Sequence, residues 1–232
     1  MANNFYNAVR RNVSADSTQP TQVYAAPNSK KSILIELDVV NKSSSGVTVT
    51  VCMCDESQNQ THSLSGTVTN ANASSVTVAT GTSGLFTTGS SEPHNLIVND
   101  RVVFTASSAP SFTDASLPPS GDTALSIDAG SGSRMYYVQS IPSASTFTIA
   151  ESESASSPLT FDNAGNSVKM VKVHLADIVR DAPVPVGGSL KVISGQKLVI
   201  ESQTANVNDK IFVYSSAANA VDCIASVLED VS

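Results

Sequence analysis

The feature that most constrains this chain is an alternation of apolar and polar residues with a period of two, carried by short runs rich in Val, Ile and Thr. Val47–Cys52 alternates strictly, and Ser32–Val40 alternates over part of its length. Successive side chains of an extended strand point to opposite faces, so a period of two predicts half-buried β-strands. We find no convincing amphipathic helix, and the sequence therefore predicts an all-β protein.

Pairs of these runs are separated by short polar or small-residue connections, which are typical of antiparallel hairpins. The sequence predicts three hairpins: Ser32–Val40 with Val47–Cys52, Ser189–Ile193 with Lys197–Glu201 across a turn at Ser194–Gln196, and Asp209–Tyr214 with Val221–Glu229. Several short strands at regular spacing favour an antiparallel β-sandwich of the jelly-roll or immunoglobulin-like type.

The middle of the chain differs in composition from its flanks. Residues 66–168 are rich in Ser, Thr, Gly and Pro, and they carry two basic and eight acidic residues, a net charge of −6. The rest of the 232-residue chain has 11 basic and 12 acidic residues and is close to neutral. Such a shift indicates a separate module inserted into a loop of another domain.

We therefore predict three parts: an N-terminal arm at residues 1–20, a β-sandwich docking domain formed by residues 21–65 and 169–232, and an inserted acidic, Ser/Thr-rich β domain at residues 66–168. The arm, which contains Arg10 and Arg11, shows little strand or helix pattern. It is either a frayed tail or a segment that becomes ordered against a neighbouring subunit on assembly.

Within the insert, the residue pattern predicts strands at Asp100–Thr105, Met135–Val138 and Thr146–Ile149, with a turn at Ile141–Ser145 between the last two. The long stretch Ser107–Gly121, rich in Ser, Pro and Gly, is expected to be an exposed loop.

Charge and hydropathy exclude several classes of partner. The formal net charge is −7 with only 13 Lys and Arg residues, which argues against a dedicated nucleic-acid binder. No window approaches the roughly 18 apolar residues of a membrane-spanning helix. The first residues lack the apolar stretch of a secretion signal, so we expect a soluble protein made in a cytoplasm.

The three cysteines are too few for a disulfide framework. Cys52 and Cys54 are two residues apart on an expected strand, so both point to one face, as two small buried residues would. The alternative, a metal pair, has no nearby Cys or His residues to complete four ligands.

The three histidines offer little support for catalysis. His94 is expected to pack and hydrogen-bond within a turn, His174 to lie on an alternating strand facing away from Val171 and Val173, and His62 to lie in a polar loop. A Ser-His-Asp triad lacks the nucleophile-elbow sequence that would support it.

The remaining candidate ligand groups are also weak. Asp114, Asp122 and Asp128 lie in a glycine-rich region, but their spacing differs from that of a calcium-binding loop, and solvated loop acids are the better interpretation. Residues 129–133 contain glycines without the Lys-Ser/Thr pair of a phosphate-binding loop. We expect no catalytic, cofactor-binding or metal site.

Part of the insert resembles a known type of module. His94-Asn95-Leu96, Asn99–Phe104, Tyr136-Tyr137-Val138 and Ile141–Phe147 follow the pattern of small β-barrel modules that recur in tailed-phage virion proteins. Asn95 and Asn99 stand where those modules have glycine, and Asn is the next best residue for a positive φ. The resemblance implies a small β-barrel between Glu92 and Glu151.

The outer parts resemble a short β-sandwich common in phages of marine and freshwater bacteria. The similarity lies in Lys30–Ile35, in Ile193–Val199 and, most clearly, in the ending from Ser215–Asn219 through Val227–Glu229. Proteins of this type are virion structural proteins without an activity. The resemblance implies a component of a phage particle.

The leading hypothesis is a non-enzymatic virion structural protein of a tailed phage, present as a homo-oligomeric accessory component on the outside of the head, neck or tail, of the decoration, cement or collar type. Its partners would be copies of itself and capsid, neck or tail proteins, with no cofactor, nucleic acid or membrane. The near-neutral sandwich would dock through strand edges and apolar patches, while the acidic insert would face water.

Two other functions stay open at this point. A tail-fibre or receptor-binding module would recognise a host-surface glycan, and sugar sites favour aromatic platforms. The insert has seven aromatic residues and the chain has no Trp, which makes this the weaker hypothesis. An enzyme such as a wall hydrolase would need paired acids or metal ligands, and no such group stands out.

Overall fold

In the part of the chain that the computed structural model describes, all the numbered elements are β-strands, and all pairs of these strands are antiparallel. The structure describes residues 4–57, 72–73, 76–89, 93–113, 121–127, 134–204 and 207–229. The prediction of an all-β, sandwich-like fold is confirmed.

The chain divides into two compact units, the first formed by Met1–Ser57 with His174–Ser232 and the second by Gln58–Val173. The second unit leaves the first at the end of β4 (Val47–Cys54) and returns at the start of β14 (Leu175–Val184). These two strands pair, with Leu175 opposite Cys54. The second unit therefore takes the place of the turn in an antiparallel hairpin.

The boundaries differ from the predicted ones. The sequence analysis placed residues 169–173 in the sandwich, but they form β13 (Lys169–Val173), which pairs along its whole length with β8 (Arg101–Thr105) of the second unit. The return to the first unit therefore comes at His174 rather than at residue 169.

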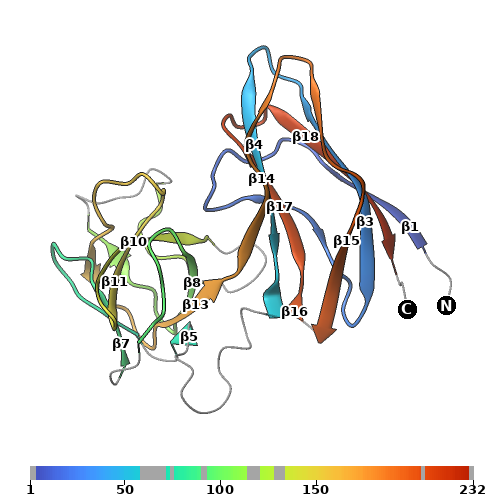
Figure 1. Ribbon diagram of the computed structural model, residues 1–232. Helices are drawn as coiled ribbons and strands as arrows, with labels where there is room; N and C mark the ends of the chain where they lie inside the picture. Colours follow the sequence, from blue (N-terminus) through green and yellow to red (C-terminus); the bar gives the residue numbers. More distant parts are fainter. Residues whose placement is uncertain are drawn as a thin grey trace. The chain divides into compact units, whose positions relative to one another are not determined.

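The first unit consists of two sheets (Figure 1). The five-stranded sheet has the order β1 (Asn4–Arg10), β18 (Val221–Glu229), β3 (Lys31–Asn41), β15 (Ser189–Thr204) and β16 (Val207–Asn208). The four-stranded sheet has the order β14, β4, β17 (Lys210–Ser215) and β2 (Thr21–Ala25).

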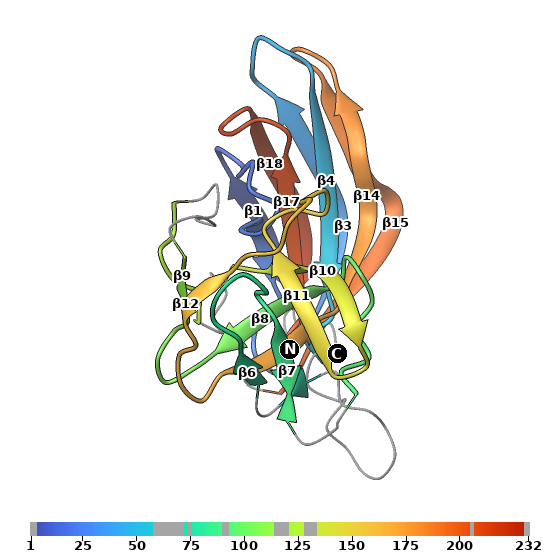
Figure 2. The same cartoon turned by 90° about the vertical axis from the view of Figure 1, so that its left-hand side faces the viewer.

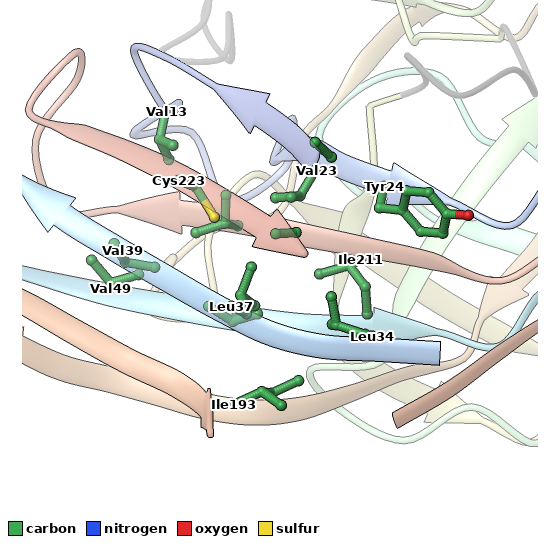
Figure 3. Packing of buried hydrophobic residues seen from close by; sticks show 14 of the residues in the cluster. Val13, Val23, Tyr24, Leu34, Leu37, Val39, Val49, Ile193, Ile211 and Cys223 are labelled. Carbon is green, nitrogen blue, oxygen red and sulfur yellow. The ribbon is translucent and has the colours of Figure 1, made fainter. Parts of the chain in front are cut away.

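Aliphatic side chains from both sheets fill the space between them (Figure 3). Leu37 and Val39 come from β3, whereas Val49 comes from β4 and Ile211 from β17, and each is at most 1% exposed. Burial of one such side chain stabilises a fold by about 1.5–3 kcal/mol. This shared layer explains why period-two alternation recurs in strands of both sheets.

Tyr24 forms hydrogen bonds between the two sheets. Its hydroxyl lies 2.8 Å from the Ser32 hydroxyl and donates a 2.8 Å hydrogen bond to the Glu229 carboxylate. Tyr24 belongs to β2, while its partners belong to β3 and β18 of the other sheet. Burial is the main cause that raises the pKa of Tyr24, so its hydroxyl stays protonated and able to donate.

The three predicted hairpins of the first unit are wrong. β3 and β4 lie in different sheets, as do β17 and β18, so each of these connections crosses the sandwich. The residues around Gly195 do not form a turn between two strands, because β15 runs on through them. Gly195 has a φ of 75° and lies where the register with β3 shifts, so it marks a bulge.

The predicted separate arm is also wrong for the described residues. β1 pairs with β18 over seven residues without a shift in register, from Asn4 opposite Glu229 to Arg10 opposite Cys223. The backbone N–H of Val13 donates to the carbonyl oxygen of Val221 at 2.9 Å, and Val13 is fully buried. The strand pattern is weak because Ala8 is the one residue of β1 in the buried class.

The second unit contains a seven-stranded sheet that curls on itself, in which β7, β11 and β10 lie side by side (Figure 2). Its order is β5 (Asn72–Ala73), β13, β8, β10 (Tyr136–Ser143), β11 (Thr146–Ala150), β7 (Phe86–Thr88) and β6 (Val76–Val78). The N–H of Val76, where β6 begins, donates to the carbonyl oxygen of Val168, next to β13, at 2.9 Å. The two ends of the sheet therefore approach each other, as in a small barrel.

The strands that the sequence predicted in the insert are present as β8, β10 and β11, and β10 and β11 form the expected hairpin. The predicted turn at Ile141–Ser145 is too long, because β10 runs to Ser143 and only residues 144–145 connect it to β11. The expectation of an exposed loop at Ser107–Gly121 is wrong in part. Ser111 and Phe112 form β9, which pairs with β12 (Phe161–Asn163), and Phe112 is only 3% exposed. Residues 114–120 of that stretch lie outside the described residues.

Aromatic rings form the centre of the second unit's core. Phe86 is fully buried, with ring centroids of Phe104, Phe147 and Phe161 at 5.0, 5.1 and 5.4 Å. Such offset and edge-on pairs add to the free energy gained from burial alone.

Replacing Phe86 by Ala is expected to destabilise the second unit by about 3–5 kcal/mol, because it removes a ring that contacts three others and leaves a cavity. The control is Ile97→Ala, at a side chain that is 67% exposed, which should change stability by less than about 0.5 kcal/mol. Urea unfolding of both variants measures the difference. Equal losses in the two variants would contradict this view of the core.

Candidate functional site

The most distinctive surface of the described residues is an apolar area on the five-stranded sheet of the first unit. Phe5 is 75% exposed, Val199 51%, Val9 47% and Ile224 43%. We call this area, together with the half-buried Ile33 and Leu228, the outer apolar face. Scattered exposed apolar residues are normal, but contiguous ones mark sites of interaction.

The strand register makes these residues neighbours. Phe5, Leu228, Ile33 and Val199 are successive Cα partners across β1, β18, β3 and β15. Directly paired residues of antiparallel strands point to the same side of the sheet, with Cβ atoms about 4.5–5.5 Å apart. The four residues therefore form one continuous row across four strands.

The opposite side of the same strands faces the core. Val227 and Leu34, each next in sequence to a residue of the row, are fully buried and belong to the core cluster. Val9 and Ile224 are Cα partners of each other and lie on the outer side, because β1 and β18 pair without a shift in register. Both faces of these strands thus carry apolar residues.

A row of polar and charged residues runs between the Phe5 row and the Val9–Ile224 pair of the outer apolar face. The row beside Phe5 contains Asn7, Ser226, Glu36 and Ser194 as successive Cα partners. Lys191 of β15 forms an ion pair with Glu36 of β3, which raises the pKa of the Lys191 ammonium. The outer apolar face therefore consists of a row of four apolar residues and a separate apolar pair, with polar groups between them, and protein–protein interfaces commonly combine both kinds of residue.

The sequence analysis did not identify this face, although one signal was present. Ile33, Leu34 and Ile35 are three consecutive apolar residues, a pattern that fits a strand covered on both sides. Phe5 and Val9 gave no signal by themselves, because β1 was not predicted as a strand.

His94 has a structural role in the turn where the sequence placed it. Its side chain is 2% exposed, and Nδ1 accepts a hydrogen bond from the Leu96 N–H at 3.0 Å. Nε2 therefore carries the proton, and it lies 3.1 and 3.2 Å from the carbonyl oxygens of Ser143 and Thr146. Both ring nitrogens thus bind backbone groups, which confirms the expected packing and local hydrogen bonding.

Asn95 and Asn99, for which the sequence predicts a positive φ, lie close to His94 in the chain. Asn95 has a φ of 48° and Asn99 a φ of 73°. Both are in the left-handed region that glycine adopts most easily and that Asn tolerates better than most residues. The prediction of positive φ at these two positions is confirmed.

Of the other two histidines, the structure describes only His174. His174 lies between β13 and β14 rather than within a strand, and its carbonyl oxygen accepts a 3.1 Å hydrogen bond from the Asp55 N–H. The expectation of a strand histidine is therefore wrong. His62 lies outside the described residues.

Cys52 and Cys54 are buried in β4 and are not disulfide-bonded, as expected for two small side chains on one side of a strand. Cys223, in the core between the sheets, is also free and fully buried. Burial, with a smaller contribution from the Asp38 carboxylate, raises the pKa of the Cys223 thiol to about 12. At neutral pH this thiol is protonated and is a poor nucleophile.

Of the three aspartates considered for calcium, the structure describes only Asp122. Its carboxylate lies 3.0 Å from Nε of Arg134, whose Nη1 lies 3.3 Å from the Glu151 carboxylate. The Arg134 side chain is nearly buried, and its guanidinium lies between the carboxylates of Asp122 and Glu151. We therefore assign this cluster a structural role. Asp114 and Asp128 lie outside the described residues.

Among the described residues, no group of three or more His, Cys, Asp or Glu side chains gathers where it could hold a metal ion. Within the same part of the chain, no helix is long and apolar enough to span a membrane.

The aromatic residues of the insert are buried in its core. The following seven are all at most 3% exposed: Phe86, Phe104, Phe112, Tyr136, Tyr137, Phe147 and Phe161. A sugar-binding platform needs an exposed ring, and these rings pack against one another and their neighbours instead.

Comparisons with family models, with curated proteins and with solved structures find no match to this chain.

The buried thiol predicts a pH dependence of stability. Cys223 ionises near pH 9 when unfolded but near pH 12 when folded, so its contribution is complete below pH 9 and is lost as the pH rises toward 12. Between pH 8 and pH 10, the wild-type protein should lose roughly 1 kcal/mol more unfolding free energy than Cys223→Val, which has no thiol.

Urea unfolding of both proteins at the two pH values measures this difference. Ionisation of the tyrosines and of the other two cysteines is common to both proteins and cancels. An identical pH dependence in wild type and variant would mean that the thiol is not shielded from water.

Proposed function

We propose that this chain is a non-enzymatic structural component of a tailed-phage particle, a homo-oligomeric accessory protein on the outside of the head, neck or tail. It would contact copies of itself and other particle proteins through its first unit, and it would use no cofactor. The observation that carries the docking role is the outer apolar face, a row of apolar side chains across four strands.

Exposing the outer apolar face to water costs free energy. Water contact with apolar surface is unfavourable by about 25 cal/mol per Å², and a strand of a two-layer sandwich needs apolar residues on one side only. β18 nevertheless places Ile224 and Leu228 opposite a fully buried inner side. A second protein that covers the outer side of such a strand would remove its apolar side chains from water and so stabilise the complex.

The assignment to a phage particle rests on the resemblances in the sequence. The turn around His94 supports it, because Asn95 and Asn99 have the positive φ values that the module pattern requires of glycine at these positions. The charge distribution supports docking by the first unit, since residues outside 66–168 are close to neutral and avoid the repulsion that a strongly charged surface would bring.

The alternative of a glycan-binding tail-fibre module has less support. The seven aromatic residues of the insert are core residues, so none of them presents a ring to a sugar. We therefore retain docking as the function that the described residues favour.

The test is reconstitution onto particles that lack the protein. Purified wild-type chain should sediment with particles made from a phage genome in which this gene is deleted. Val199→Lys combined with Ile224→Lys should weaken binding about tenfold or more, because it places two charges on the outer apolar face. Both side chains point outward and are about half exposed, so the fold should remain intact.

The matched control is Val186→Lys, which makes the same change at a 59% exposed residue of the first unit, between β14 and β15. It should bind like wild type. Failure of wild-type protein to bind the particles, or full binding by the double variant, would contradict the proposal.

A further inference from the structure

The strand β1 lies at an edge of its sheet, where its backbone can form hydrogen bonds with a further strand. It forms one end of the five-stranded sheet and pairs only with β18 in that sheet. In an antiparallel strand, alternate residues direct their N–H and C=O groups to opposite sides. Half of the backbone groups of Asn4–Arg10 therefore point away from β18, toward the open edge.

Other edge strands of the first unit carry features that discourage such pairing. β14 has two shifts in register and the charged residues Asp177, Arg180 and Asp181, while β16 has two residues and β2 has five. Short length, bulges and charges are the usual protections of a sheet edge. β1 has seven residues in perfect register and no charge before Arg10.

The sequence of β1 is complementary to itself in the antiparallel direction. When two copies are centred on Asn7, Phe5 of each lies opposite Val9 of the other, and Tyr6 lies opposite Ala8. Phe5 and Val9 are both exposed and both lie on the outer side of the sheet, so each apolar side chain meets an apolar partner.

Charge does not oppose the same register. Arg10 of the second copy lies opposite the uncharged Asn4, so no like charges face each other. Within each copy, Nε of Arg10 donates to the Gln22 carbonyl oxygen at 2.8 Å, and the Glu229 carboxylate accepts from the Tyr24 hydroxyl.

We propose that two copies of this chain associate through β1, antiparallel and centred on Asn7, so that their five-stranded sheets become one continuous sheet. This pairing rests on the proposed homo-oligomeric function and specifies its interface. A two-fold axis at Asn7 makes the contact closed, because each copy uses its only β1. It also joins the outer apolar faces of the two copies into one larger surface.

Cysteine cross-linking tests the register directly. In Asn7→Cys, the two introduced thiols face each other across the axis, at a Cα separation of about 4.5–5.5 Å that a disulfide accepts. Mild oxidation should convert this variant into a covalent dimer that reducing agent reverses. Ile97→Cys, which is exposed on the second unit, should stay uncross-linked, and the three native cysteines are buried.

A second variant tests the association without cross-linking. Phe5→Lys places a charge opposite Val9 of the second copy and should shift the wild-type dimer to monomer in sedimentation equilibrium. Val186→Lys, at a 59% exposed position away from β1 and from the outer apolar face, should leave the dimer intact. Because Phe5 is 75% exposed, circular dichroism should show the same strand spectrum for all variants.

The outcomes separate the pairing from the proposed function. A wild-type oligomer that persists in Phe5→Lys and does not cross-link through Asn7→Cys overturns the β1 pairing and leaves the proposed function standing. A wild-type protein that is monomeric at every concentration and does not cross-link through Asn7→Cys overturns the pairing as well. Loss of particle binding by Val199→Lys and Ile224→Lys concerns the proposed function alone.

Discussion

The first unit depends on one layer of aliphatic side chains that two sheets share. Every inner residue of β18, from Val221 to Val227, is fully buried, and the same strands supply the outer surface with their remaining residues. A slip of one residue would exchange these two sides and expose the core, so the register of each strand is strongly fixed. The outer apolar face follows from that register.

The second unit shows how an independent core can be added without disturbing the first. It is inserted between β4 and β14, which pair with each other. The two points at which the chain leaves and re-enters the first unit are therefore about one strand spacing apart. Its own core is aromatic, centred on Phe86, whereas the core of the first unit is aliphatic. Each unit therefore has the residues it needs to fold around its own centre.

Local sequence predicted several of the strands, though not β1, β2 or β14, and it predicted their partners poorly. Alternation identifies β3 and β18, each of which buries one side, and also β4 and β17, which bury residues such as Cys52 and Phe212 on their second side as well. It says nothing about which strand lies next to it, so connections that cross the sandwich were predicted as hairpins. β1 was missed because Ala8 is the single buried residue that this strand contributes.

The turn around His94 was predictable for a different reason. Asn95 and Asn99 stand where the modules that the insert resembles have glycine, and Asn tolerates a positive φ, so the resemblance indicated both positions. The outer apolar face could not be, because it requires the register of four strands from three distant parts of the chain. Ile33–Ile35 gave only a partial signal, and the burial of Phe112 through β9 gave none.

We propose that the five-stranded sheet is covered by protein on its outer side and along β1 when the chain is assembled. Amide hydrogen exchange of the full chain, free in dilute solution and bound to particles, measures this most directly. We expect the amides of Asn4–Arg10 to exchange much more slowly in the bound state, while those around Ile97 are unchanged. Unchanged exchange across β1, with new protection confined to the second unit, would contradict the account.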